Sequence, residues 1–293
     1  MCRLISCSPL VLLLLADAAA AQVSLSWKLP VGSGFTLERV YQQKQTIEAK
    51  GKTFKQDSTN TWTTRLVVKK AADSEIILEQ TIVSVTSKHT PPPAAGSDDT
   101  LSTQLAEKMK GSVFQVTITP SGRVRKLDGY DDLIKKMADG KPELEKSLRF
   151  LIPETALRDG LEEALGFLPE KPVQPQGRWQ RQAVDPVPPF GALKTVFEYT
   201  YLGRQDGADE IAYSMQTTFV PSTKDLGLIR VVKGTLETMD GKGKVLFDRD
   251  KGMLIRGEKQ VRIQGNLTLE TPGNTTSNLE FTSENRLQWR IVP

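Results

Sequence analysis

The chain has 293 residues, and its 39 lysines and arginines against 35 aspartates and glutamates give a net charge of +4. This small basic excess is spread along the chain, which excludes the clustered footprint of a nucleic-acid-binding protein, so no nucleic-acid partner is expected. The two cysteines, Cys2 and Cys7, lie in a segment that we expect to be removed. The remaining chain must fold without disulfides, which a core of this size allows.

The first 21 residues have the pattern of a secretory signal peptide. Arg3 precedes the apolar run Leu10–Leu15, and the small residues Ala18–Ala21 follow. The apolar run is shorter than the ~20 residues of a membrane span, and no later stretch is longer and equally apolar, so no transmembrane segment is expected. We expect cleavage near Ala21 and export to the periplasm or the extracellular space.

Residues 22–127 form a β-rich part in which apolar and polar side chains alternate, as in strands joined by hairpin turns. A Pro-rich loop is expected over Ser87–Thr103, and a short helix over Leu101–Lys110. Strands are expected at Phe35–Ala49, Asn60–Lys69, Glu75–Thr86, Val113–Thr119 and Arg123–Leu127.

Residues 128–168 change to a helical period. Apolar side chains recur at helical spacing over Tyr130–Met137. Pro142 and Pro153 mark the starts of two further helices, and Gly166 marks the end of the last. The sequence therefore predicts a block of three short helices.

Residues 169–191 are rich in proline and are interpreted as a linker with one strand near Trp179–Ala183. Residues 192–293 are again β-rich, and Asp240-Gly241 predicts a hairpin turn there. Strands are expected in this part around residues 197–201, 211–219, 228–238, 253–270 and 279–291.

The stretch Met253–Glu270 alternates for longer than an ordinary strand. At about 3.3 Å per residue it would span roughly 55 Å, against a usual strand of ~17–20 Å, so it must bend. Gly257 and Gly265 are expected to permit a bulge or kink. The parity interpreted as inward holds Met253, Ile255, Val261, Ile263, Leu267 and Leu269.

Together these patterns predict a mainly β (α+β) fold. Its sheet or sheets are long, curled and antiparallel, and the three short helices pack on the concave face. Whether the two β-rich parts share one sheet is left open by the sequence.

Few residues suggest a catalytic or metal-binding site. His89 is the only histidine, and its place beside the Pro-rich loop favours an exposed loop residue over a catalytic base. Residues 248–252 begin like a calcium loop, but Gly252 and Lys259 stand where acidic ligands are needed, so a hairpin turn is favoured. Glu162 and Glu163 are helix neighbours that should point in different directions. We expect no catalytic residues, no metal and no cofactor, although carboxylates on separate strands could still meet in a glycosidase-like site.

Eight aromatic side chains are expected to face inward. They are interpreted either as ordinary core under the helical block or as the lining of an apolar cavity, where a bound acyl chain gains about 0.8 kcal/mol per CH₂. These candidate ligand-lining residues are Trp62, Phe197, Tyr199, Tyr201, Tyr213, Phe219, Phe281 and Trp289.

The runs Gly111–Leu127, Phe167–Val173 and Gly177–Trp179 resemble a family of secreted bacterial proteins of unknown function. That resemblance implies an envelope or exported location and supplies no catalytic residues. The expected architecture also loosely resembles the periplasmic lipoprotein carriers of the LolA/LolB type, without any motif matched residue by residue.

Three hypotheses of different classes follow. The first is a non-enzymatic exported protein of the bacterial envelope that binds a hydrophobic ligand, a lipid or a lipid-bearing envelope partner in the concave sheet. The alternative is a structural or protein-interaction module with a fully packed core. An enzyme that uses scattered carboxylates is the third, and it requires convergent carboxylates with shifted pKa values. Asn266 and Asn274 also fit the N-glycosylation pattern, whose use depends on the host.

Overall fold

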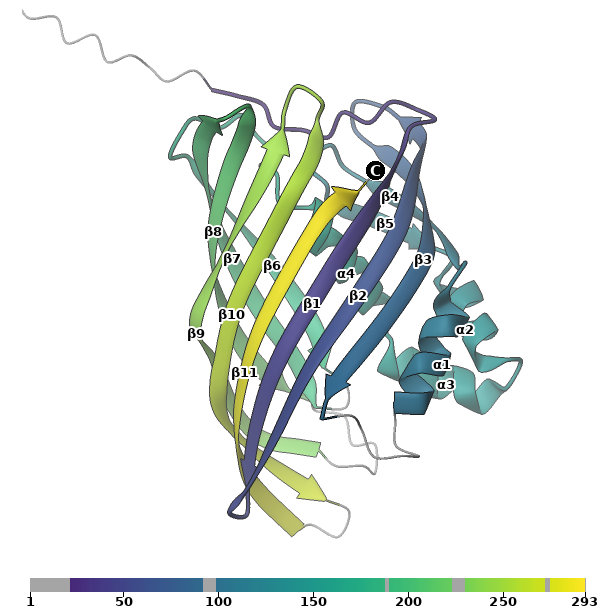
Figure 1. Ribbon diagram of the computed structural model, residues 1–293, viewed down its shortest axis with the longest axis vertical. Coiled ribbons are helices and arrows are strands. Elements are labelled where there is room, and N and C mark those ends of the chain that lie inside the picture. The colour runs from purple at the N-terminus through teal and green to yellow at the C-terminus, as the bar shows by residue number, and fades with distance from the viewer. Residues whose placement is uncertain (1–21, 92–98, 188–189, 223–229, 272–274, 293) are drawn as a thin grey trace, which may run out of the picture.

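The computed structural model describes residues 22–91, 99–187, 190–222, 230–271 and 275–292. Its strands form one eleven-stranded antiparallel sheet (Figure 1). The strands are β1 (Gly34–Ala49), β2 (Lys52–Ala71), β3 (Ile76–Thr90), β4 (Val113–Ile118), β5 (Val124–Asp128), β6 (Arg178–Val187), β7 (Gly191–Gln205), β8 (Ala208–Pro221), β9 (Arg230–Asp248), β10 (Met253–Thr271) and β11 (Thr275–Val292). The helices are α1 (Asp99–Met109), α2 (Tyr130–Ala138), α3 (Pro142–Leu151) and α4 (Glu154–Leu165).

The first and last strands meet in the middle of the sheet. The strand order is β5-β4-β3-β2-β1-β11-β10-β9-β8-β7-β6, so every neighbour is sequential except the β1–β11 pair. That pair is long and regular, running from Thr36 opposite Val292 to Ala49 opposite Leu279. The two β-rich parts of the chain therefore share one sheet.

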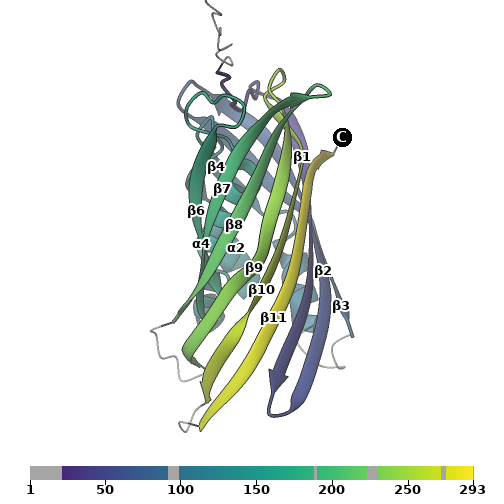
Figure 2. The ribbon, with the colours of Figure 1, turned by 90° about the vertical axis from the view of Figure 1, so that its left-hand side faces the viewer.

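The sheet does not close on itself, because its edge strands β5 and β6 do not pair. Helix α4 contacts both edges, and Figures 1 and 2 show it running beside β6. On the β5 side, the backbone N–H of Val124 donates to Glu162 Oε2 at 3.2 Å. On the β6 side, Trp179 Nε1 donates to the carbonyl of Phe167 at 3.2 Å. The helix and the residues after it thus bridge the two edges, which would otherwise expose unpaired backbone groups.

An aromatic cluster fixes the C-terminal end of α4. Trp27 donates from Nε1 to the carbonyl of Leu165 at 2.9 Å, and its ring packs edge-on against Phe167 and Phe247. Gly122, in the turn between β4 and β5, has φ +83° and lies so close to the Leu165 carbonyl that a Cβ would overlap it. Only glycine fits that backbone conformation and that approach.

The four expected helices are all present. α1 contacts β3 and α2, whereas α2 packs against α3. Tyr130 at the start of α2 donates to the carbonyl of Ile152 at 2.8 Å, which ties the end of α3 to α2. The placement of α2, α3 and α4 on the concave face stays a prediction. Of the helices that the structure describes, none has the length and apolar character to cross a membrane.

The long strand β10 has bulges, but not at its glycines. The register with β9 shifts between Leu254 and Arg256, and again near Ile263 and Leu269. The first bulge reverses the side-chain parity, so Leu254 is buried whereas Ile255 is 41% exposed. The predicted inward position of Ile255 is therefore wrong.

Gly257 and Gly265 are instead places of close approach, so the prediction that they permit the bulges is wrong. A Cβ on Gly257 would lie 2.2 Å from the Trp289 ring, and one on Gly265 would lie 1.7 Å from the carbonyl oxygen of Thr235. These glycines make room for neighbouring atoms rather than for a kink.

The prediction of a hairpin turn at Asp240-Gly241 is also wrong. β9 runs through both residues to Asp248, and the register with β10 jumps from Asp240 to Thr238. Met239 between them is 62% exposed. A Gly-containing dipeptide marks a bulge as readily as a turn, and here the neighbouring strands continue on both sides.

Candidate functional site

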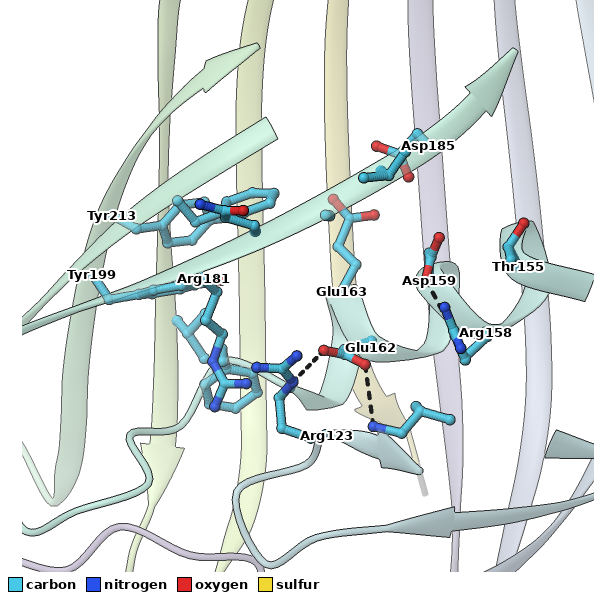
Figure 3. Close-up of a pocket in the computed structure, with 18 of the residues that line it drawn as sticks. Arg123, Thr155, Arg158, Asp159, Glu162, Glu163, Arg181, Asp185, Tyr199 and Tyr213 are labelled. Carbon is cyan, nitrogen blue, oxygen red and sulfur yellow. Dashed lines mark hydrogen bonds and ion pairs between the residues drawn. The ribbon is translucent and has the colours of Figure 1, made fainter. Parts of the chain in front are cut away.

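A cavity of about 400 Å³ lies between α4 and strands β6–β8 (Figure 3). This volume is within the range of roughly 300–1,000 Å³ that is usual for small-molecule sites. Aromatic side chains from the sheet form one wall, and charged side chains from α4 and β6 form the other. The aromatic wall consists of Phe197, Tyr199, Tyr213 and Trp289.

Cross-strand pairing holds the aromatic wall rigid. Tyr199 on β7 lies directly opposite Tyr213 on β8, with ring centroids 5.1 Å apart, and it stacks on Trp179 of β6 at 5.4 Å. Tyr213 in turn faces Gly243 on β9, where a Cβ would meet the tyrosine ring, and donates from its hydroxyl to the Glu258 carbonyl at 3.1 Å. Large rings opposite glycines produce a flat apolar surface with few alternative rotamers.

Carboxylates from α4 form the facing wall. Glu162 pairs with Arg123 from the turn between β4 and β5, and also accepts the Val124 N–H. Glu163 pairs with Lys259, whose side chain points inward from β10. As expected from their adjacent places on a helix, the two glutamates reach different partners.

Asp185 on β6 carries a shifted pKa. Loss of water around its carboxyl, the charge of Glu163 and, to a smaller extent, that of Asp159 raise the pKa of Asp185 to about 6, while Lys259 opposes them. Burial also raises the pKa of Asp159, against the pull of Arg158 at 3.5 Å. Figure 3 shows Asp185, Glu163 and Asp159 on the same side of the cavity. Lys259 and Arg158 pair with Glu163 and Asp159, so the net negative charge of this end is that of Asp185, whose carboxyl group can hold a proton up to about pH 6.

The other end of the cavity is basic. Arg181 on β6 is only 8% exposed and donates from Nη2 to the Leu168 carbonyl. Its Nε and Nη1 have no hydrogen-bond partner among the described residues. Burial, and then the charge of Arg123, lower the pKa of Arg181. A guanidinium that is buried without a counter-ion is costly, which makes this residue unusual.

Two further cavities adjoin α4 from the side of β1–β3. One, of about 450 Å³, shares Glu163 with the first cavity and includes Tyr41 and Trp62. The other, of about 260 Å³, shares Arg39 and Trp62 with the second. Arg39 lies 5.8 Å from the Trp62 ring centroid and donates to the Gly160 carbonyl at 2.5 Å, so it links β1 to the middle of α4.

The eight predicted ligand-lining residues separate into groups. Four of them form the aromatic wall, and Trp62 borders the second and third cavities. Tyr201 lies elsewhere and donates to the buried Asp209 at 2.7 Å. Phe219 and Phe281 line none of these three cavities.

The charged lining was missed from the sequence. The signal for it was present, because Lys259 falls on the inward parity of a strand otherwise apolar on that face. Arg181 likewise lies on the same, inward face of β6 as Trp179 and Ala183. Charged side chains are rarely buried without a partner, so their inward positions could have identified Lys259 and Arg181 as site residues.

His89 is not a loop residue, so that prediction is wrong. It lies in β3 opposite Ser58, is half-buried, and has its Nε2 2.9 Å from the Ser87 hydroxyl. β3 simply extends further toward the Pro-rich stretch than its alternation indicates. The turn expected at residues 248–252 is present, with Asp248 accepting the N–H groups of Asp250 and Lys251. Within the described ranges, no group of three metal-ligating side chains occurs.

Several predictions concern residues outside those that the structure describes. These are the signal peptide over residues 1–21, most of the proline run at 91–96, and Asn274. Asn266 is described, and it is exposed on β10.

Comparisons with known proteins identify a family but no function. A family model described as a family of unknown function (DUF6263) matches residues 68–254. No curated protein matches the chain at a significant level. The function must therefore be argued from the cavity itself.

Three solved structures illustrate the structural likenesses. A structure titled for lipid–protein interactions in lipovitellin has a TM-score of 0.49 and 9% identity, covering 91% of this chain and 26% of that one. The chain thus spans about a quarter of that structure's length. The COG4313 outer membrane channel from Pseudomonas putida F1 has a TM-score of 0.20 and 12% identity, covering 91% and 98% of the two chains. A DUF1329 family protein from Desulfovibrio piger ATCC 29098 has a TM-score of 0.13 and 10% identity, covering 86% and 83%.

Proposed function

This chain belongs to the DUF6263 family of unknown function, and we propose that it binds a hydrophobic or lipid-like ligand in the cavity beside α4. The observation that carries the proposal is the aromatic wall of that cavity. Its four rings border about 400 Å³ that no side chain of the described residues fills. The cavity is partly open to solvent, and its size and aromatic lining are those of a small-molecule site.

The energetics favour an apolar ligand. Each CH₂ moved from water onto this wall contributes about 0.8 kcal/mol, and an aromatic surface held by cross-strand pairs loses little entropy on binding. The alternative, an interaction module with a fully packed core, predicts no such space. The adjoining cavities that include Trp62 also count against it.

The proposal includes a location and a role. The protein is exported after cleavage near Ala21, its helices α2–α4 cover the concave face of the sheet, and it carries its ligand in the envelope without acting on it chemically. An envelope protein would receive or supply that ligand. N-terminal sequencing of protein recovered from the exported fraction tests the cleavage, and a mature N-terminus far from Gln22 would contradict it.

A second candidate function is acid–base catalysis by Asp185 and Glu163. The raised pKa of Asp185 beside a second carboxylate is the observation that favours it. The ion pair of Glu163 with Lys259 weighs against it, because a paired carboxylate is a poorer base. The two functions differ in what happens to the ligand: a carrier releases it unchanged, whereas an enzyme converts it.

Native mass spectrometry of residues 22–293, purified without detergent, tests the proposal. We expect a mass excess that disappears on denaturation and that fragments as an apolar molecule. The variant Tyr199→Ala should lose it, while Phe54→Ala, which removes an aromatic ring that is 56% exposed on β2, should retain it. A bare polypeptide mass that persists after incubation with lipid extract would overturn ligand carriage. A bound molecule that is chemically altered by wild type but not by Asp185→Asn would instead favour catalysis.

A further inference from the structure

We propose that the ligand carries an anionic headgroup, a carboxylate or a phosphate, and that this group binds Arg181. The inference rests on the proposed function, since it names the chemical class of the molecule in the same cavity. Arg181 supplies the polar end of the site, and the aromatic wall supplies the apolar end.

The first argument is the unsatisfied hydrogen-bonding capacity of Arg181. The side chain is more than nine-tenths buried, yet only Nη2 has an acceptor, the Leu168 carbonyl. Nε and Nη1 have none among the described residues. A guanidinium presents its donors as a planar fork that matches two oxygens of a carboxylate or phosphate. Both donors have almost no solvent-accessible surface in the ligand-free protein, so an anion from outside the chain reaches them only when the guanidinium turns toward the cavity.

The second argument is charge balance. Arg123 lies beside Arg181 in Figure 3, but its charge is compensated by Glu162. Glu162 is fully engaged, because its other oxygen accepts the Val124 N–H. Within the part of the chain that the structure describes, no carboxylate forms an ion pair with Arg181. Glu170, whose side chain is 66% exposed, offsets part of this charge from 3.9 Å away from Arg123 but forms no ion pair with Arg181. The buried guanidinium therefore lacks a direct counter-ion, in a place where an unpaired charge is costly.

The third argument is the orientation that the charges of the cavity would give to a bound ligand. Arg181 pairs with Phe197 in the β6–β7 register, so a headgroup on Arg181 starts next to the aromatic wall. Asp185 lies four residues further along β6, roughly 13 Å at the usual strand rise. Glu163 and Asp159 lie at the same end but are paired with Lys259 and Arg158, so the net negative charge of that end is the charge of Asp185. An anion is attracted at one end and repelled at the other, which fixes the orientation of an amphipathic ligand.

Equilibrium dialysis with three radiolabelled probes tests the inference. Dodecanoate has both tail and charge, 1-dodecanol has the tail alone, and inorganic phosphate has the charge alone. We expect the wild-type protein to bind dodecanoate about tenfold or more tightly than dodecanol, as one charge-assisted contact implies. Free phosphate should bind far more weakly than dodecanoate, because it gains nothing from the aromatic wall.

Variants assign the preference to Arg181. Arg181→Gln should bind both tailed probes alike, and Arg181→Lys should keep part of the preference. Arg125→Gln removes the same charge from an exposed position on the other edge strand, β5, and should behave as wild type. Thermal unfolding of the ligand-free proteins checks folding. Removal of an uncompensated buried charge should leave the Tm of Arg181→Gln unchanged or raised, whereas a purely structural arginine would lower it.

The outcomes separate the two proposals. If wild type binds neither tailed probe, ligand carriage itself fails. If it binds dodecanoate and dodecanol equally, carriage stands and the anionic headgroup is overturned. If Arg181→Gln is folded and still prefers dodecanoate, the assignment to Arg181 is overturned. Phosphate binding as tight as that of dodecanoate would mean a site for free anions rather than for a lipid headgroup.

Discussion

Gly257 on β10 and Trp289 on β11 lie directly opposite each other, and the indole ring occupies the space that a side chain at residue 257 would fill. Trp289 is 2% exposed and also borders the cavity beside α4. The glycine therefore sets the position of one ring of the aromatic wall.

The first prediction is that Gly257→Ala destabilises the protein and disturbs the cavity. The added Cβ would lie 2.2 Å from the indole, so the ring must move. Overpacking of this kind costs about 1–3 kcal/mol. Urea unfolding should show the loss of stability, and the affinity for an apolar ligand should fall. An unchanged midpoint would mean that Trp289 is not held against the glycine.

Gly160→Ala is the matched control. Gly160 lies in the interior of α4, where alanine is preferred over glycine by about 1 kcal/mol. Its added Cβ would lie 3.2 Å from Arg39 Nη1, the atom that donates to the Gly160 carbonyl, so the guanidinium must shift slightly. This small shift offsets the gain in helix propensity, so Gly160→Ala should change stability by less than Gly257→Ala does, which separates steric conflict from a general effect of replacing glycine.

The second prediction separates two tyrosines that the sequence alone treats as equivalent. Tyr199→Leu keeps an apolar side chain but removes a ring from the aromatic wall, so ligand affinity should fall by about two- to tenfold. Tyr201→Phe removes the donor to Asp209, a fully buried carboxylate. It should lower the free energy of unfolding by about 1–3 kcal/mol and leave ligand affinity unchanged. Weaker ligand binding by Tyr201→Phe would place that residue in the site after all.

Alternation and turn residues were enough to predict most of the strands and all four helices. They failed where the register shifts. A single bulge reverses the parity of Ile255, and another turns Asp240-Gly241 from an apparent hairpin into the middle of β9. Bulges depend on the neighbouring strand, which a pattern along one strand does not contain. The polar first half of β2 was missed for a related reason, since it is exposed and lacks the alternation that a buried face imposes.

The aromatic wall was within reach of the sequence, because inward parity identifies its residues. Its polar counterpart was not. Glu163 meets Lys259, which lies 96 positions further along the chain. Arg181 is notable because no carboxylate of the described residues forms an ion pair with it. Both facts depend on where α4 lies between the sheet edges. The sequence shows which residues are charged, but the three-dimensional packing determines which of them form ion pairs.

The third prediction concerns the ion pair that joins α4 to the sheet. Lys259 and Glu163 are 15% and 26% exposed, which places their pairing between a surface and a buried salt bridge. Lys259→Met leaves Glu163 unpaired beside Asp185, so stability should fall by about 1–3 kcal/mol. The double variant Lys259→Met with Glu163→Gln should recover most of that loss. Urea unfolding of the four proteins gives the coupling energy.

Lys242→Met provides the comparison for that cycle. Lys242 pairs with Asp240 at 3.2 Å, but both side chains are more than 60% exposed. Its removal should change stability by less than about 0.5 kcal/mol. A coupling energy near zero for Lys259 and Glu163 would show that this pair contributes no more than the exposed one.

The fourth prediction is a pH dependence that originates at Asp185. Its pKa is raised to about 6 by loss of water and by Glu163, so the folded protein binds this proton more tightly than the unfolded chain does. Stability from this group is therefore highest below about pH 4, falls as the pH rises through about 6, and stays constant above that. Asp185 is exposed on β6, so solvent screens the charge of Glu163 and the change in stability should be small.

Carbon-13 NMR of the aspartate carboxyl groups measures this pKa directly. Glu163→Gln removes the neighbouring charge and should lower the pKa of Asp185. In urea unfolding at pH 4 and pH 7, Asp185→Asn should lose less stability than wild type between the two values. Asp57→Asn, at an exposed position on β2, should show the wild-type difference. An Asp185 that titrates near 4 in the folded protein would show that its carboxyl is fully hydrated, and the acidic end of the cavity would then be open to solvent.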